Sequence, residues 1–213
     1  MILFIKVFLL LTVAFLAGII FWKSLSIFLK IIVVQLGLGI AAQTWGAVYG
    51  MNNLSLNNLG YNLYITLEVC LLAGANAIYL NRLKDRIIIA TGLICFGAAM
   101  VTDFSRKTAF AFSDHAYIVE CLLLVLLYLM LLTREVIAKI EKITRSPLFW
   151  IGIGSILYFG CNIPYFSMRP YFEKTNSKLT TSLFILNKIL LNFRYLFVLI
   201  AFLLQRKQSH RKI

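Results

Sequence analysis

The stretch Leu183–Leu204 reads LFILNKILLNFRYLFVLIAFLL, and it decides what kind of fold this chain adopts. Its 22 residues are enough to cross a bilayer as an α-helix, because about 20 apolar residues span the hydrocarbon. The stretch nevertheless contains Lys188 and Arg194, and it has no acidic residue of its own. A cation at the centre of the hydrocarbon costs about 3 kcal/mol on insertion scales, so we expect other helices to supply partners for Arg194.

The composition extends this conclusion to the whole chain. Of its 213 residues, 61% are hydrophobic and 14% are charged, whereas soluble domains are less apolar and more highly charged. The sequence therefore predicts an all-α, polytopic membrane protein that consists of a single domain over residues 1–213. Seven apolar runs predict a bundle of seven transmembrane helices, at residues 2–22, 27–48, 61–80, 87–102, 116–133, 147–166 and 183–204.

The first run has an alternative reading as a signal peptide. Lys6 precedes apolar residues, and the small residues within 14–18 resemble a cleavage site. The run is long for a signal peptide and stays apolar as far as Trp22, so we expect a retained span.

The distribution of basic residues predicts the orientation. Seven spans divide the connections and termini between two sides of the membrane, with 13 Lys and Arg residues on the side of the C-terminal tail and six on the other. Basic residues accumulate on the cytoplasmic side of membrane proteins, which predicts the N-terminus outside and the C-terminus inside. The basic segment Arg134–Arg145 is expected to be a cytoplasmic linker, and residues 51–60 are expected to form an uncharged outer loop.

Polar residues from several predicted spans fall at a similar depth. With this topology, Glu68, Glu120 and Lys188 lie about 6–10 Å below the outer boundary at 1.5 Å per residue. Gln43 and Asn162 are about five residues from the outer ends of their own spans. Lipid offers no hydrogen-bond partner, so these side chains are expected to face the interior of the bundle.

We therefore expect Glu68 and Glu120 to neutralise Arg194 and Lys188 around a polar pocket that is open to the outer side. The candidate ligand-binding or ion-pair residues are Glu68, Glu120, Lys188, Arg194, Asn192, Asn162, Gln43, Tyr64 and Tyr158. Two alternatives stay open: Lys188 and Glu120 could extend to the headgroups, and the Glu68–Arg194 pair could be purely structural.

Several functional classes find no support in the sequence. The basic residues are scattered over short connections, which argues against nucleic-acid binding. Four cysteines, all within predicted spans, are expected to be small buried residues, and with two histidines in the chain we expect neither a metal nor a cofactor. No arrangement of a nucleophile with a base appears in the spans, so we do not expect an enzyme. Lys188 is too close to the outer end of its span, and its surroundings too different, for a retinal protein.

Some motifs resemble a known family. They are Asn62-Leu63-Tyr64 with Glu68, a glutamate early in the fifth span, and Ser146-Pro147-Leu148-Phe149-Trp150 followed by Gly154, Leu157, Tyr158 and Phe159. Together they resemble small seven-span inner-membrane proteins of Bacteroidetes-type bacteria, over most of the chain. The resemblance implies a seven-helix bundle in the inner membrane, and it implies no particular activity.

The functional expectation is a sensor or accessory signalling module with an outward-facing polar pocket. The alternative is a transporter or channel-like protein that uses the intramembrane glutamates for protons or cations. The lipid bilayer is the expected environment, and a separate cytoplasmic signalling partner is expected at Arg134–Arg145 or at the C-terminal tail.

Overall fold

The computed structural model describes residues 2–50, 53–106, 110–138, 140–175 and 177–210 of the chain. Within these ranges the chain is helical almost throughout and contains no β-strand. The helices are α1 (Ile2–Ile20), α2 (Ile27–Tyr49), α3 (Leu54–Tyr79), α4 (Leu83–Arg106), α5 (Asp114–Ala138), α6 (Pro147–Thr175) and α7 (Ser177–His210), with short 3₁₀ turns at Trp22–Ser24 and Ile140–Arg145.

The helices extend beyond the apolar runs that predicted them. The expected outer loop at 51–60 is wrong for its described part beyond Asn53, because α3 begins at Leu54. The Asn53 side chain accepts a hydrogen bond from the Leu56 backbone N–H at 3.1 Å, and this cap starts the helix earlier than hydropathy suggests. Apolar runs mark the part of a helix that lies in hydrocarbon, whereas capping residues mark where the helix begins.

The same extension shortens the predicted linkers. The start of the basic segment continues α5 as far as Ala138, and Ile140–Arg145 forms a 3₁₀ turn; Lys139 lies outside the described residues. The C-terminal tail continues α7 as far as His210, and residues 211–213 lie outside the described ranges.

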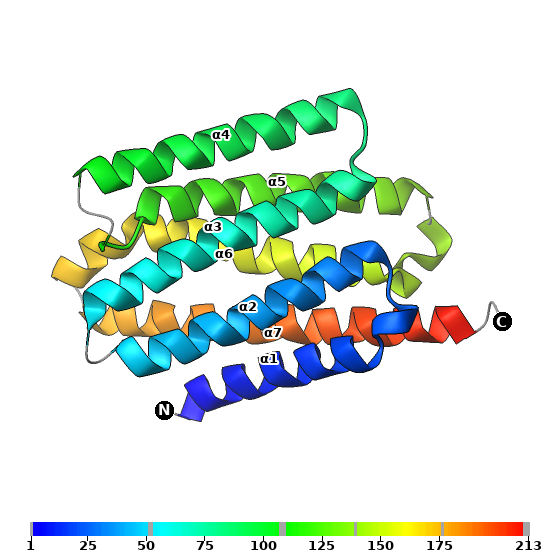
Figure 1. Cartoon of the computed structure of the whole chain (residues 1–213), viewed down its shortest axis with the longest axis horizontal. Coiled ribbons are helices and arrows are strands. Elements are labelled where there is room, and N and C mark those ends of the chain that lie inside the picture. The colour runs from blue at the N-terminus through cyan, green and yellow to red at the C-terminus, as the bar shows by residue number, and fades with distance from the viewer. Residues whose placement is uncertain (1, 51–52, 107–109, 139, 176, 211–213) are drawn as a thin grey trace.

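The helices form a bundle whose long axis is horizontal in Figure 1. Helix α6 packs closely between α5 and α7, α2 packs on α3, and α1 packs on α7 and α2. Helix α4 lies at the edge of the bundle, mainly against α5. The start of α1 and the end of α7 are at opposite ends of the bundle (Figure 1).

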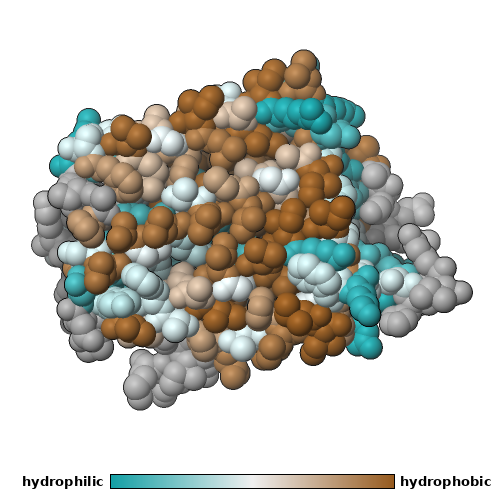
Figure 2. Space-filling view, viewed as in Figure 1, coloured by the Kyte–Doolittle hydropathy of each residue, from teal (hydrophilic) through white to brown (hydrophobic). Residues whose placement is uncertain are grey.

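The outer surface of the bundle suits a bilayer. Helices α2 to α7 contain segments long and apolar enough to cross a membrane, whereas the apolar part of α1 that can be assessed, Val7–Ile20, is shorter. Figure 2 shows hydrophobic residues over the middle of the visible face and hydrophilic residues gathered toward its ends. The chain is therefore a multi-pass, all-helical protein built for a membrane.

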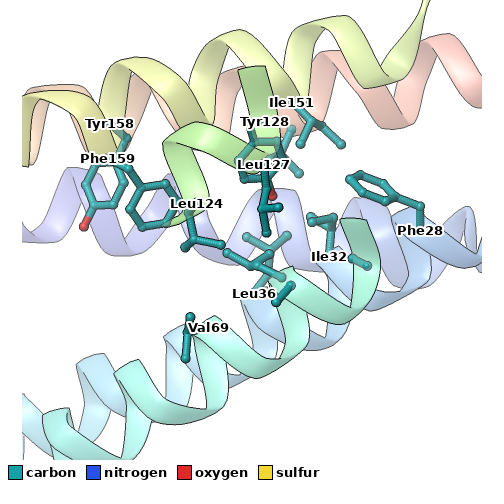
Figure 3. Packing of buried hydrophobic residues seen from close by; sticks show 14 of the residues in the cluster. Phe28, Ile32, Leu36, Val69, Leu124, Leu127, Tyr128, Ile151, Tyr158 and Phe159 are labelled. Atoms are coloured by element: carbon teal, nitrogen blue, oxygen red, sulfur yellow. The ribbon is translucent and has the colours of Figure 1, made fainter. Parts of the chain in front are cut away.

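The hydrophobic core runs through the bundle and takes buried side chains from all seven helices. Figure 3 shows part of this core, with Phe28 and Leu36 of α2, Leu127 of α5 and Phe159 of α6 spread along it. All four side chains are almost completely buried. Close helix contacts also use glycine: a Cβ atom at Gly92 of α4 would lie only 2.3 Å from Leu123 Cδ1 of α5. The absence of a side chain at this position lets α4 and α5 approach closely.

Candidate functional site

A cavity opens at one end of the bundle, the end where α2 finishes and α3 begins. Its volume is about 540 Å³, and residues of α2, α3, α5, α6 and α7 line it. It is half open to the surroundings and has a strongly aromatic wall. Six tyrosines contribute to that wall: Tyr61, Tyr64, Tyr117, Tyr158, Tyr165 and Tyr195.

Glu68 of α3 lies at the deep end of this cavity and pairs with Arg194 of α7. Arg194 Nη1 donates a hydrogen bond to Glu68 Oε1 at 3.0 Å. Both residues are nearly inaccessible, at 2% for Glu68 and 4% for Arg194. The structure thus brings together the two deepest charges in the predicted set.

Neighbouring polar and aromatic groups complete the surroundings of this ion pair. Gln35 Nε2 of α2 donates to Glu68 Oε1 at 2.8 Å and to the Tyr64 hydroxyl at 3.1 Å. The Arg194 guanidinium lies 5.1 Å from the ring centroid of Tyr158 and 4.6 Å from that of Phe159. A desolvated cation over an aromatic face gains about 2 kcal/mol, which helps to offset the burial of this charge.

The ion pair also joins the cavity wall to α7, because Glu68 lines the cavity and Arg194 binds it from that helix. Helices α3 and α7 have little close backbone contact within the described residues, so the two long side chains bridge the gap between them. One turn further along α3 is Leu72, and two turns further along α7 is Phe202, both completely buried. Glu68 is therefore the deepest α3 residue of the cavity wall, and close-packed apolar side chains follow it.

Glu120 of α5 has a different environment. It is completely buried, and neither of its carboxyl oxygens has a hydrogen-bond partner among the described residues. The expected neutralisation of Lys188 by Glu120 is therefore wrong for this structure. Glu120 does not line the cavity, whereas Lys188 does, with its ammonium group 5.2 Å from the ring centroid of Phe184.

The polar residues of the predicted set are divided between the cavity and the helix interfaces. Gln43, Tyr64 and Tyr158 line the cavity. Asn162 of α6 is buried beside it, accepts a hydrogen bond from the Asn187 amide and donates to the carbonyl of Tyr158. Asn192 donates to the Lys188 carbonyl of its own helix at 3.1 Å and is not part of the cavity wall.

Several residues of the site were missed by the sequence analysis, some in the cavity wall and one behind it. The sequence signal for Gln35 was a single amide within an apolar run, and that amide proves to be the second partner of Glu68. Tyr117 and Tyr195 carried no separable signal, because tyrosines are common near the ends of membrane helices. Arg169 of α6 also lines the cavity, and its guanidinium lies 3.7 Å from the Asp114 carboxylate of α5.

A second polar contact ties helices together near this end of the bundle. The Asp103 carboxylate of α4 accepts hydrogen bonds from the backbone N–H groups of His115 and Ala116, and it lies 2.6 Å from His115 Nδ1. A carboxylate at the first turn of a helix satisfies its free N–H groups and complements its dipole, so Asp103 anchors the beginning of α5.

The cysteines do not form a site. Only Cys121 is buried, whereas Cys70, Cys95 and Cys161 are exposed on the outside of the helices, so the expectation that all four are buried is wrong. A cysteine is apolar enough to face lipid as well as protein, and hydropathy does not separate the two positions. The described part of the chain contains no group of three or more His, Cys, Asp or Glu residues that could hold a metal ion.

Comparison with known proteins gives no relative: no protein family, curated protein or solved structure matches this chain.

Proposed function

We propose that this chain is a seven-span inner-membrane receptor or accessory signalling protein, which binds a small molecule in the cavity at its outer end. In this arrangement the N-terminus is outside and the C-terminus is in the cytoplasm, as the excess of basic residues on the C-terminal side predicts. The observation that carries the proposal is the cavity that six tyrosines line together with Glu68, the carboxylate that pairs with Arg194.

The size and chemistry of the cavity support ligand binding. A volume of about 540 Å³ falls within the range of small-molecule sites, which are commonly lined by aromatic residues and a few polar groups. Lys188, Arg169 and Asn187 supply polar groups near the mouth, and the tyrosine rings supply apolar area. The packed core beyond the ion pair favours a binding site over an open channel.

Filling the cavity tests this proposal. The purified protein in lipid nanodiscs would be screened by thermal shift against a broad set of small polar, anionic and aromatic compounds. A compound that binds raises the unfolding temperature, because it stabilises the folded state alone. Ala42→Trp places a large ring in the cavity wall and should abolish the shift, whereas Ile94→Trp on the exposed face of α4 should preserve it. No stabilising compound, or equal shifts in both variants, would overturn the proposal.

A signalling role also requires a cytoplasmic contact. The basic segment Arg134–Arg145 and the C-terminal part of α7 lie at the end of the bundle opposite to the cavity. Under this proposal, a separate acidic partner binds there. Ligand-dependent crosslinking of the partner at this end, lost in Ala42→Trp and kept in Ile94→Trp, would support it.

The second candidate is a transporter, and the unpartnered carboxyl group of Glu120 favours it. An acid buried between the cavity and the core could carry a proton while a solute moves. Liposomes that contain a pH-sensitive dye separate the two candidates. Proton flux that is lost in Glu68→Gln and Glu120→Gln supports transport, whereas binding without flux supports a receptor.

A further inference from the structure

Glu120 is a buried acidic residue whose carboxyl group accepts no hydrogen bond from the described residues. It has 0% exposure, and both carboxyl oxygens are without a hydrogen-bond donor among the described residues. An isolated carboxylate in a medium of low polarity is far more costly than a neutral carboxylic acid. Arg194, the nearest candidate for a counter-ion, is already engaged by Glu68 at 3.0 Å.

The charges around Arg194 also favour a neutral Glu120. Glu68 and Glu120 are two acids in the buried layer, and Arg194 is the one cation that acts on both. With both acids ionised, the cluster would carry one uncompensated negative charge inside the bundle. One bound proton makes the cluster neutral, and the carboxyl group without hydrogen bonds is the one that can hold it without losing a partner.

Among the described residues, the other ionisable groups that act on Glu120 are acids, thiols and phenols and include no second cation. From α3 it is approached by Glu68 and Cys70, and its own helix contributes Tyr117 and Cys121. From α6, Tyr158 directs its hydroxyl to that of Tyr117 at 3.3 Å.

Helix α4 also packs on α5 but brings no cation to Glu120. Its Asp103 is engaged by His115, its Cys95 is exposed, and its Asp85 pairs with Arg134 at the opposite end of the bundle. The described partners of α5 thus leave Arg194 as the one cation that acts on the Glu120 carboxyl.

We propose that Glu120 is a proton-binding site, and that Glu68, Glu120 and Arg194 together hold one proton, which resides on Glu120 while Glu68 pairs with Arg194. The ligand is the proton itself, and it is exchanged with the water of the cavity. Tyr117 lines that cavity one helical turn before Glu120 on α5, which places the carboxyl directly behind the cavity wall.

This inference goes beyond the proposed function, because the proton site exists whether or not the cavity binds a compound. It also predicts how the proton site and the cavity are connected. An occupant of the cavity lies against Tyr117 and Tyr158 and changes the access of water to Glu120. A compound found in the thermal-shift screen should therefore change the rate of hydrogen exchange at this carboxyl.

Infrared spectroscopy tests the inference directly. The full-length protein in nanodiscs at neutral pH should show the carbonyl-stretch band of a protonated carboxylic acid, and the band should shift after exchange into heavy water. Glu120→Gln should remove the band completely. Glu135→Gln is the matched control, because Glu135 is an acid of the same helix that binds Ser146 outside this cluster, and its removal should leave the band in place. Glu68→Gln is a second test: it makes Glu120 the one remaining acid of the cluster beside Arg194, so Glu120 should ionise and the band should also disappear.

The results of this experiment distinguish failure of the proton site from failure of the receptor proposal. A wild-type protein without the band overturns the inference, and so does a band that Glu120→Gln leaves intact. Glutamine is similar in shape to a neutral glutamic acid, so Glu120→Gln should also fold, and failure to fold would contradict a neutral Glu120. The band can be present while the compound screen finds nothing, in which case the receptor proposal fails and the proton site stands.

Discussion

Two buried glutamates on neighbouring helices, Glu68 of α3 and Glu120 of α5, have opposite surroundings. Glu68 accepts hydrogen bonds from Arg194 and Gln35, whereas Glu120 has no partner among the described residues. Both side chains are removed from water to nearly the same extent. The difference shows that burial alone does not determine the role of an acid, because the groups facing it decide whether charge or neutrality costs less.

The two regions are also connected differently to the rest of the fold. Glu68 belongs to a bridge that joins α2, α3 and α7 at the deep end of the cavity. Glu120 lies on α5, which packs against α3, α4 and α6, and its carboxyl group forms no bridge to the described residues of these helices. We therefore expect substitutions at the Glu68 cluster to change stability and substitutions at Glu120 to change proton binding.

The largest effect should follow from breaking the ion pair. Arg194→Gln leaves Glu68 buried without its counter-ion, which should lower the free energy of unfolding by about 3–5 kcal/mol. Denaturant unfolding in detergent micelles measures this change. In the double variant Glu68→Gln with Arg194→Gln no charge is left unpaired, so it should be more stable than Arg194→Gln alone. If Arg194→Gln is as stable as the wild type, the pair does not hold the bundle together.

The second effect concerns the amide that supports Glu68. Gln35→Leu removes the hydrogen bonds to Glu68 Oε1 and Tyr64, and should cost about 1.5–3 kcal/mol, as expected for bonds to a charged group. The control is Gln43→Leu on the same helix, where the side chain lines the cavity and changes stability by less than about 0.5 kcal/mol. If Gln35→Leu and Gln43→Leu lower the free energy of unfolding equally, Gln35 does not stabilise Glu68.

A smaller change is expected at the aromatic wall. Tyr158→Phe removes the hydroxyl contact with Tyr117 but keeps the ring under Arg194, so it should cost about 0.5–1.5 kcal/mol. Tyr158→Leu also removes the ring and should cost more, because the cation–π contact is lost as well. If Tyr158→Phe and Tyr158→Leu have the same free energy of unfolding, the ring does not stabilise Arg194.

The smallest effect on stability should be at Glu120. Glu120→Gln exchanges one neutral polar group for another of similar shape, so the free energy of unfolding should change by less than about 0.5 kcal/mol. Glu68→Gln, measured beside it, should lose much more because Arg194 is left without its carboxylate. A reversed order, with Glu120→Gln the less stable variant, would mean that Glu120 is the charged member of the cluster.

The fold was predictable in its main features and the site only in part. Apolar runs predicted all seven helices, because a helix that crosses lipid is predominantly apolar over about 20 residues. Their ends were not predictable to the same degree, since the cap at Asn53 and the extensions of α6 and α7 depend on local hydrogen bonds and on packing outside the hydrocarbon.

Within the site, Glu68 and Arg194 could be expected to meet, because each is a deep charge that has no partner on its own helix. The amide of Gln35 and the ring of Phe159 could not be assigned to them, because many apolar and amide residues lie at similar depths. The placement of Glu120 behind the cavity wall depends on the rotation of α5, and hydropathy gives little information about rotation.

The sequence by itself determined that this is a multi-pass helical membrane protein, and that Arg194 needs a partner from another helix. Both conclusions follow from the cost of exposing charge and backbone polar groups to hydrocarbon, and this cost depends on composition and length. The tertiary structure decided that Glu68 pairs with Arg194, whereas Glu120 has no hydrogen-bond partner among the described residues. That choice depends on which faces of α3, α5 and α7 turn toward one another, and packing among all the helices sets those rotations.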